Sequence, residues 1–288
     1  MKIINDFEYY KPLEIKEALN LLSQYKAKAR ILAGGTDLIV SLKEERINPE
    51  ALIDVKGIIP LNLMELEDDK LFIGANKTFT DLLESDLIRD KFPLLWECSS
   101  KVASIGIRNR ATLTGNICSA VPSLDSAPAL LIYNAEVLVA ASNTERTISI
   151  HDWFTGPKKS ALNTDELVLG ISLKIPDKHS ASYQKLGRYK GEDLAQAGIG
   201  IYVDREKDYR FASCAVGPVP ARMKKLEAFL HKKEINDKLL AEAAEIIPSE
   251  ISPITDIRAQ AEYRTHMMKV MFRRGMQIAL EVLPGGKE

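Results

Sequence analysis

Ile31-Leu32-Ala33-Gly34-Gly35-Thr36-Asp37-Leu38 is the stretch that decides the fold of the first part of this chain. Residues 29–33 are short and apolar and stop at the paired glycines, and helical spacing of apolar residues begins at Leu38. This pattern predicts a strand, a glycine turn and a helix. Paired glycines let an anion approach the backbone, and the free N–H groups at a helix start bind phosphate. We therefore expect a phosphate cradle, and a side chain added at Gly35 is expected to enter it.

The same turn also has a purely structural interpretation. It can be a tight strand-to-helix connection in which Thr36 or Asp37 serves as the N-cap. The third glycine of the GxGxxG fingerprint is missing, which disfavours a Rossmann domain.

A second polar stretch, at residues 104–117, reads Ser-Ile-Gly-Ile-Arg-Asn-Arg-Ala-Thr-Leu-Thr-Gly-Asn-Ile, and Pro-Ser-Leu-Asp-Ser-Ala-Pro follows at 122–128. Small side chains with donors and acceptors suit a polar, extended ligand such as a ribityl chain with a diphosphate. The alternative is a glycine-rich connection whose hydroxyls satisfy its own backbone.

Composition excludes several classes of protein. The chain has 288 residues, enough for two domains, with 45% hydrophobic and 27% charged residues. Its 39 basic and 40 acidic residues create no global attraction to nucleic acid or membrane. The first residues lack an apolar signal segment, and no apolar run approaches the ~18 residues of a membrane span. We expect a cytoplasmic protein.

Metal binding and thiol chemistry are not expected. The cysteines are far apart and form no CxxC pair, and the histidines are scattered without ligand spacing. The residues concerned are Cys98, Cys118, Cys214, His151, His179, His231 and His266.

The remaining pattern indicates an α+β protein with a boundary near Asp177. We expect strands at residues 52–55, 71–75, 136–140, 147–150, 182–186, 198–203 and 211–216. Helices are expected at residues 12–25, after Thr80, and at 94–104, 221–231, 238–247 and 259–280. In the last of these helices, Met267, Met268 and Met271 suggest core, whereas Arg264, Arg273 and Arg274 suggest a solvated basic face.

The ordered set of motifs resembles the FAD-binding medium subunits of the molybdenum hydroxylase family, which includes xanthine dehydrogenase, nicotinate dehydrogenase and aerobic carbon monoxide dehydrogenase. The resemblance runs from end to end. It is carried by Phe7-x-Tyr9-x-x-Pro12, Ala33-Gly34-Gly35-Thr36-Asp37, Ile107-Arg108-Asn109 through Asn116, Thr155-Gly156-Pro157 and Glu262-Tyr263-Arg264.

This resemblance implies two domains. Residues 1–177 would form a FAD-binding domain of the vanillyl-alcohol oxidase (PCMH) type, with subdomains at about 1–56 and 57–177. Residues 178–288 would form a smaller α+β domain of the carbon monoxide dehydrogenase flavoprotein C-terminal type, with a three-stranded antiparallel sheet and helices.

The resemblance also implies a set of FAD contacts and no catalytic or metal-binding residue in this chain. The set consists of Ile31, Leu32, Ala33, Gly34, Gly35, Thr36, Asp37, Leu38, Thr112, Thr114, Gly115, Asn116, Asp125, Val168 and Lys185. Thr114 departs from the family, which usually has glycine there, and its side chain would stand beside the diphosphate.

Lys185 is implied to lie near the pyrimidine edge of the flavin, where a cation would stabilise the anionic reduced ring. A solvated lysine on a strand is the alternative, and Arg188 and Lys190 are equally plausible by composition. Tyr183 and Tyr189 are candidates to cover a face of the flavin.

As a member of this family, the chain would be the FAD-containing electron-transfer subunit of a heteromeric oxidoreductase. A large molybdopterin subunit and a small subunit with [2Fe–2S] clusters would be its partners, and FAD would pass electrons to NAD or another acceptor. A stand-alone flavin oxidoreductase of the vanillyl-alcohol oxidase superfamily and a non-catalytic scaffold are the alternatives. The substrate is left open.

Overall fold

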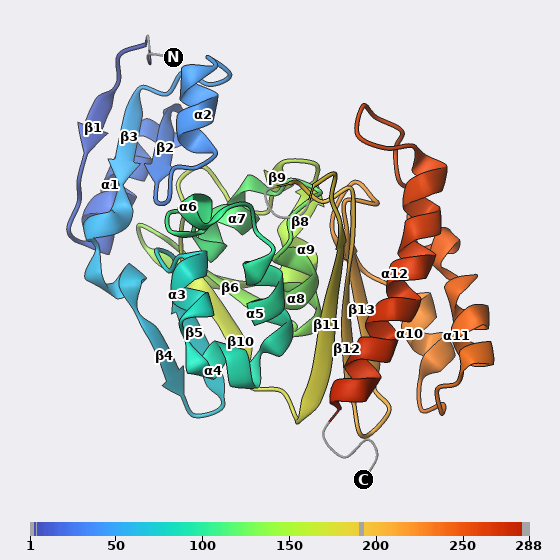
Figure 1. The fold of residues 1–288 in the computed structure, drawn as a ribbon. Coiled ribbons are helices and arrows are strands. Elements are labelled where there is room, and N and C mark those ends of the chain that lie inside the picture. Colours follow the sequence, from blue (N-terminus) through green and yellow to red (C-terminus); the bar gives the residue numbers. More distant parts are fainter. Residues whose placement is uncertain (1–2, 4, 190–192, 284–288) are drawn as a thin grey trace.

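The computed structural model describes residues 3, 5–189 and 193–283. Among the described residues, three larger sheets follow one another along the chain, with a two-stranded hairpin and helices between and beside them (Figure 1). The mixture of helix and sheet that the sequence predicts is confirmed.

The first sheet is small and parallel, with strand order β1-β3-β2. Its strands are β1 (Glu8–Tyr10), β2 (Ala29–Leu32) and β3 (Ala51–Asp54), joined by α1 (Ile15–Tyr25) and α2 (Leu38–Lys43). Helix α1 forms because apolar residues recur at helical spacing, and it buries Ala18, Leu19 and Leu22. The predicted strand, glycine turn and helix are therefore present as β2, residues 33–37 and α2.

The second sheet is antiparallel and has the order β4-β5-β10-β6-β7. Its strands are β4 (Met64–Glu67), β5 (Lys70–Gly74), β6 (Glu136–Ala141), β7 (Thr144–Ser149) and β10 (Leu167–Lys174). Short helices lie beside it (Figure 1): α3 (Phe79–Leu83), α4 (Asp86–Lys91), α5 (Pro93–Ser100), α6 (Ile105–Arg108), α7 (Leu113–Ser119), α8 (Ala127–Ile132) and α9 (Ile150–Trp153). A hairpin of β8 (Phe154–Gly156) and β9 (Lys159–Ser160) completes this part.

The third sheet is antiparallel with the order β11-β12-β13-β14. Its strands are β11 (His179–Leu186), β12 (Ala197–Asp204), β13 (Tyr209–Cys214) and β14 (Ala221–Arg222), followed by α10 (Lys224–Leu230), α11 (Asp237–Ala244) and α12 (Ala261–Val282). Helices α5 and α8 contact this sheet from the preceding part of the chain, and α12 packs on its other side (Figure 1). The third sheet is thus enclosed between two layers of helices.

Several sequence expectations need correction. The C-terminal sheet has a fourth strand, because residues 221 and 222 pair with Ala212 and Ser213 before α10 begins. The helix expected at 221–231 is therefore Lys224–Leu230, and the one expected at 94–104 ends at Ser100. Strand β10 was not predicted as a strand, although it occupies the centre of the second sheet.

The basic face expected on α12 is only partly correct. Arg264 is 1% exposed, and its guanidinium donates to Asp256 at 2.6 Å and to the carbonyl oxygen of Gln196 at 2.7 Å. Arg273 and Arg274 are exposed. Met268 and Met271 are core residues, as the stripe of methionines indicated.

Candidate functional site

A cavity of about 400 Å³ lies between the turn after β2, the start of α7 and the start of β10. We call it the glycine-turn cavity. The predicted residues that line it are Ile31, Ala33, Gly34, Gly35, Thr36, Asp37, Leu38, Thr112, Thr114, Gly115, Asn116 and Val168. Its other lining residues are Leu22, Ala29, Arg30, Val55, Ala75, Ala111, Cys118, Ser119, Leu162, Asn163, Thr164, Glu166 and Leu167.

The two sequence motifs touch each other at Gly34. A Cβ atom at this position would lie 2.1 Å from the carbonyl oxygen of Arg110 and 3.0 Å from Cα of Ala111. Only glycine permits so close an approach of the two backbones. Gly34 and Ala111, which are 77 positions apart along the chain, are thereby held in one wall of the cavity.

Gly35 is required for a different reason. Its φ angle is +75°, a left-handed conformation that other residues adopt only with strain. A Cβ atom here would lie 2.9 Å from Cδ1 of Leu32. An added Cβ would therefore press against the apolar side chains of Leu32 and Ile39, and the expectation that a side chain here enters the phosphate site stays a prediction.

The turn leaves a run of backbone donors without partners. In the part of the chain that the structure describes, the N–H groups of residues 34–37 donate no hydrogen bond. Residues 34–36 are half-buried and Asp37 is exposed, so water or a ligand can reach these N–H groups and pair with them. These four consecutive donors at the cavity wall are therefore suited to bind an anionic group.

The start of α7 supplies further donors. Thr112 caps this helix, because its hydroxyl accepts a hydrogen bond from the Gly115 N–H at 2.9 Å. Thr114 is 5% exposed, and its hydroxyl has no partner among the described residues. An unsatisfied buried hydroxyl costs about 1–3 kcal/mol. Since Thr114 lines the cavity, a bound acceptor would remove that cost.

Asn116 connects the cavity to the next segment of the chain. Its side-chain oxygen accepts a hydrogen bond from the Ser126 hydroxyl at 2.6 Å. That bond fixes the orientation of the amide and leaves its NH2 group as a donor at the cavity.

The opposite wall, at residues 162–168, was largely missed by the sequence analysis, which named only Val168. Glu166 is held there by Arg146 through two hydrogen bonds of 2.7 and 2.8 Å, and it accepts from the Asn163 N–H. Burial would raise the pKa of Glu166, but the Arg146 guanidinium holds it below its usual value. The Asn-Thr-Asp-Glu sequence at 163–166 stands directly before an apolar alternation, and its residue types do not indicate a cavity wall.

Leu32, Asp125 and Lys185 are predicted site residues that do not line the cavity. Asp125 and Lys185 instead form an ion pair, with 2.8 Å between Nζ and Oδ2 and side chains 9% or less exposed. The Lys185 ammonium also donates to the carbonyl oxygen of Lys101, and the Tyr183 hydroxyl donates to Oδ1 of Asp125 at 2.7 Å. Burial raises the pKa of the Asp125 carboxyl, against the opposing effects of Lys185 and Tyr183.

A second hydrogen-bonded group joins the same two parts of the chain. Nδ1 of His179 donates to the Asp177 carbonyl oxygen, so in the neutral ring Nε2 accepts from the Tyr133 hydroxyl at 2.9 Å. The same hydroxyl accepts from the Leu94 N–H. Burial lowers the pKa of His179. We call Asp125, Tyr133, His179, Tyr183 and Lys185 together the junction network.

The remaining predicted residues contribute little to the cavity. Tyr183 is buried, Tyr189 is exposed beside Arg188, and Lys190 lies outside the described residues. Cys118 lines the cavity, but burial raises the pKa of its thiol to about 12. Within residues 3, 5–189 and 193–283, no cluster of His, Cys, Asp or Glu could hold a metal ion, and no helix is long and apolar enough to cross a membrane.

The family model described as "FAD binding domain in molybdopterin dehydrogenase" matches residues 5–177, more than half of the chain. The chain belongs to this family. The model described as "CO dehydrogenase flavoprotein C-terminal domain" matches residues 181–279. The expected resemblance to FAD-binding subunits of molybdenum hydroxylases is confirmed.

Relatives match this family member along almost their whole length. The xanthine dehydrogenase FAD-binding subunit of Escherichia coli is 29% identical over 97% of this chain and 97% of its own. The nicotinate dehydrogenase FAD-subunit of Eubacterium barkeri is 28% identical over 98% and 99%. A carbon monoxide dehydrogenase structure from Hydrogenophaga pseudoflava superposes with a TM-score of 0.93 at 29% identity, covering 98% of this chain and 99% of the other.

The cavity of this FAD-binding family member fits the phosphate-bearing part of FAD. Free N–H groups at residues 34–37 and the orphaned hydroxyl of Thr114 are donors for diphosphate oxygens. Leu22, Ile31 and Val55 add apolar surface to the same cavity. Gly34 brings the two motifs together, and nothing in the described chain pairs with the N–H donors at residues 34–37.

Proposed function

We propose that this chain is the electron outlet of a molybdenum hydroxylase complex. It receives electrons from the [2Fe–2S] clusters of a small partner subunit and passes them to NAD or another acceptor, while a large molybdopterin subunit oxidises the substrate. Bound FAD supplies the redox chemistry, since flavins accept electrons singly or in pairs. The same proposal places the complex in the cytoplasm, in keeping with three free cysteines.

The glycine-turn cavity carries this proposal. The cavity offers unpaired N–H groups at residues 34–37 and the unpaired hydroxyl of Thr114. These donors suit a ligand that has acceptors and no donors, as a diphosphate does. The described residues hold no cluster of metal ligands, which suits a chain whose contribution is a flavin.

We assign the diphosphate to residues 33–37 and to Thr112, Thr114, Gly115 and Asn116, with Ile31, Leu38 and Val168 as apolar contacts. Residues 1–177 form the FAD domain of the PCMH type, with subdomains at about 1–56 and 57–177, and residues 178–288 form the second domain. Asp125 and Lys185 lie beyond Asn116, linked to it through Ser126, and we assign them to the flavin end of the site. A fixed cation there would stabilise the anionic reduced ring.

The test has two stages. Purified alone, the chain should be yellow, with one FAD per chain, and a colourless protein that takes up no added FAD would contradict the proposal. In the complex assembled with its partner subunits, reducing substrate should bleach the flavin band. The isolated chain should show no bleaching with the same substrate, because it lacks the molybdopterin centre. Bleaching of the isolated chain would instead favour a stand-alone flavin oxidoreductase.

A further inference from the structure

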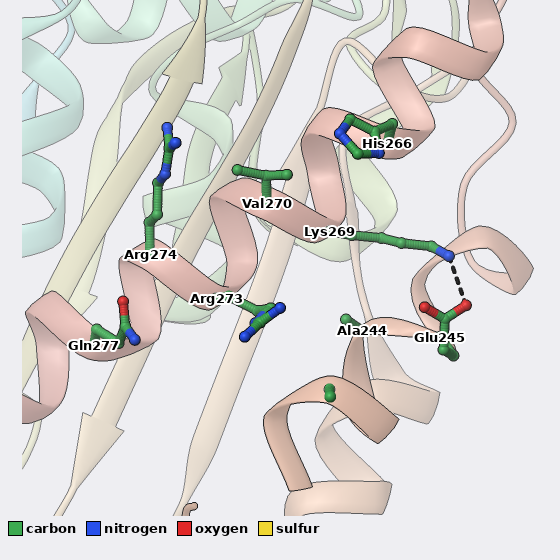
Figure 2. Close-up of a pocket in the computed structure, with 9 residues that line it drawn as sticks. Ala244, Glu245, His266, Lys269, Val270, Arg273, Arg274 and Gln277 are labelled. Atoms are coloured by element: carbon green, nitrogen blue, oxygen red, sulfur yellow. Dashed lines mark hydrogen bonds and ion pairs between the residues drawn. The ribbon is translucent and has the colours of Figure 1, made fainter. Parts of the chain in front are cut away.

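A groove of about 470 Å³ lies between α11 and α12, on the side of the third sheet away from α5 and α8 (Figure 1). Figure 2 shows the side chains that α12 presents to it. His266, Lys269, Val270, Arg273, Arg274 and Gln277 line it, and their spacing of three and four residues places them on one helical face.

Small residues on α11 keep the groove open. Ala241 and Ala244 form its opposite wall, where longer side chains would fill the space. Their shortness leaves a shallow channel along α12 from His266 to Gln277. At 1.5 Å per residue, these eleven steps correspond to about 16 Å.

The groove carries positive charge that the described chain does not neutralise. Lys269 is paired with Glu245 at 2.6 Å, as Figure 2 shows. Arg273 and Arg274, in contrast, form no ion pair or hydrogen bond with any described residue. Arg264, on the opposite face of the helix, is buried, and its charge is neutralised by an ion pair with Asp256. The two exposed guanidinium groups are therefore available to a partner.

We propose that this groove binds an acidic segment of a partner subunit. The inference rests on the proposed function, since it needs a complex. An elongated channel with separate cations suits several carboxylates along a polypeptide, and arginine pairs with carboxylates through two parallel hydrogen bonds. Electrostatic complementarity of this kind orients subunits as they associate.

Other anionic ligands fit this groove less well. It lies along the middle of α12, where backbone N–H groups are used within the helix, so it offers no phosphate cradle like the one at residues 34–37. No Phe, Tyr or Trp lines it to stack a base. Exposed Glu242, Glu262 and Glu281 lie on the same two helices, and the chain has a net charge of −1, which disfavours a nucleic acid backbone.

The experiment reverses the charge of the groove in the assembled complex. Arg273→Glu together with Arg274→Glu should raise the dissociation constant between this chain and its partners at least about tenfold, because attraction becomes repulsion. Mass photometry of a dilution series measures the constant. Lys238→Glu is the matched control, since Lys238 is exposed on α11 but outside the groove, and it should leave the constant unchanged. The milder pair Arg273→Gln and Arg274→Gln should give a smaller increase.

Cross-linking identifies the contact. A carbodiimide, which joins ammonium groups to carboxylates, should link Lys269 to an acidic residue of a partner subunit as well as to Glu245. The inference would be overturned if the double charge reversal left the dissociation constant unchanged, or if Lys269 were linked to Glu245 alone. Either result would leave the proposed function intact, as long as the chain still bound FAD and assembled with its partners. A wild-type chain that assembles with no partner subunit would contradict both this inference and the proposed function. Binding of a duplex DNA oligonucleotide that is lost in the double variant, with assembly unchanged, would also overturn it.

Discussion

The glycine-turn cavity and the junction network differ in whether their polar groups have hydrogen-bond partners. The cavity leaves backbone donors at residues 34–37 and the Thr114 hydroxyl without partners. In the junction network, both carboxylate oxygens of Asp125 accept hydrogen bonds, and Lys185 has two acceptors. Thr114 and the junction-network residues Asp125, Tyr133 and Tyr183 are buried, whereas residues 34–36 are half-buried and Asp37 is exposed.

This difference separates polar groups that await a ligand from polar groups that the chain already pairs. A buried polar group without a partner, such as the Thr114 hydroxyl, costs free energy that a ligand can recover, whereas removal of one member of a buried ion pair leaves an uncompensated charge. Changes to the unpaired groups of the cavity should therefore alter FAD affinity more than folding. Changes in the junction network should alter folding first.

The largest effect is expected from breaking the ion pair in the junction network. Lys185→Met leaves the Asp125 carboxylate buried without its cation, and it should lower the free energy of unfolding by about 3–5 kcal/mol, measured by urea denaturation in excess FAD. Adding Asp125→Leu should restore most of the loss. Lys70→Met, at an exposed pair with Glu136, is the control and should cost less than about 1 kcal/mol. If the double variant Lys185→Met with Asp125→Leu were as unstable as Lys185→Met alone, loss of the ion pair would not explain the lower free energy of unfolding.

The next effect is expected at Gly34. Gly34→Ala forces its Cβ against the Arg110 carbonyl oxygen, so the two backbone segments must separate, which displaces the donors at residues 34–37 and should lower FAD affinity roughly 100-fold, or by about 3 kcal/mol. Fluorescence titration with FAD measures this. Gly106→Ala is the matched control, because its Cβ would meet only the Ser104 hydroxyl at 4.0 Å. Equal affinities in the two variants would refute the close approach of the motifs.

A smaller effect is expected at Thr114, where one substitution should lower FAD affinity without lowering the stability of the FAD-free protein. Thr114→Val removes a hydroxyl that has no partner, so the FAD-free protein should be as stable as wild type or more stable. FAD affinity should nevertheless fall about tenfold. Thr112→Val loses the cap on the Gly115 N–H and should instead lower stability by about 1 kcal/mol. An unchanged FAD affinity in Thr114→Val would mean that the hydroxyl does not contact the cofactor.

The smallest effect concerns pH. Burial lowers the pKa of His179, so the folded protein keeps this ring neutral at a pH where the unfolded chain already protonates it. Its contribution to stability is present above pH ~6.5 and is lost as pH falls through the pKa of the folded protein, with a slope of at most about 1.4 kcal/mol per pH unit. His179→Phe should flatten the decrease in unfolding free energy between neutral and mildly acidic pH, whereas His231→Gln at an exposed position should not. Identical pH profiles for wild type and His179→Phe would exclude the effect.

Local signals predicted the elements whose residues are close in sequence. The glycine pair marked the turn after β2, the spacing of Ala18, Leu19 and Leu22 predicted α1, and alternation predicted β12. Strand β10 was missed although Leu169, Ile171 and Leu173 alternate, and its partners β5 and β6 come from distant parts of the chain. Its position in the sheet brings Val168 to the cavity.

By itself, the sequence determined that this chain has a glycine turn between a strand and a helix, a second polar motif and three widely spaced cysteines, because these depend on residue types and short spacings. Only the tertiary structure decided that Gly34 touches Arg110, that Asp125 pairs with Lys185 outside the cavity, and that α12 buries one arginine while exposing two others. These outcomes depend on contacts between residues far apart in the chain. Burial and pairing, which set the energy of every polar group, exist only once those contacts have formed.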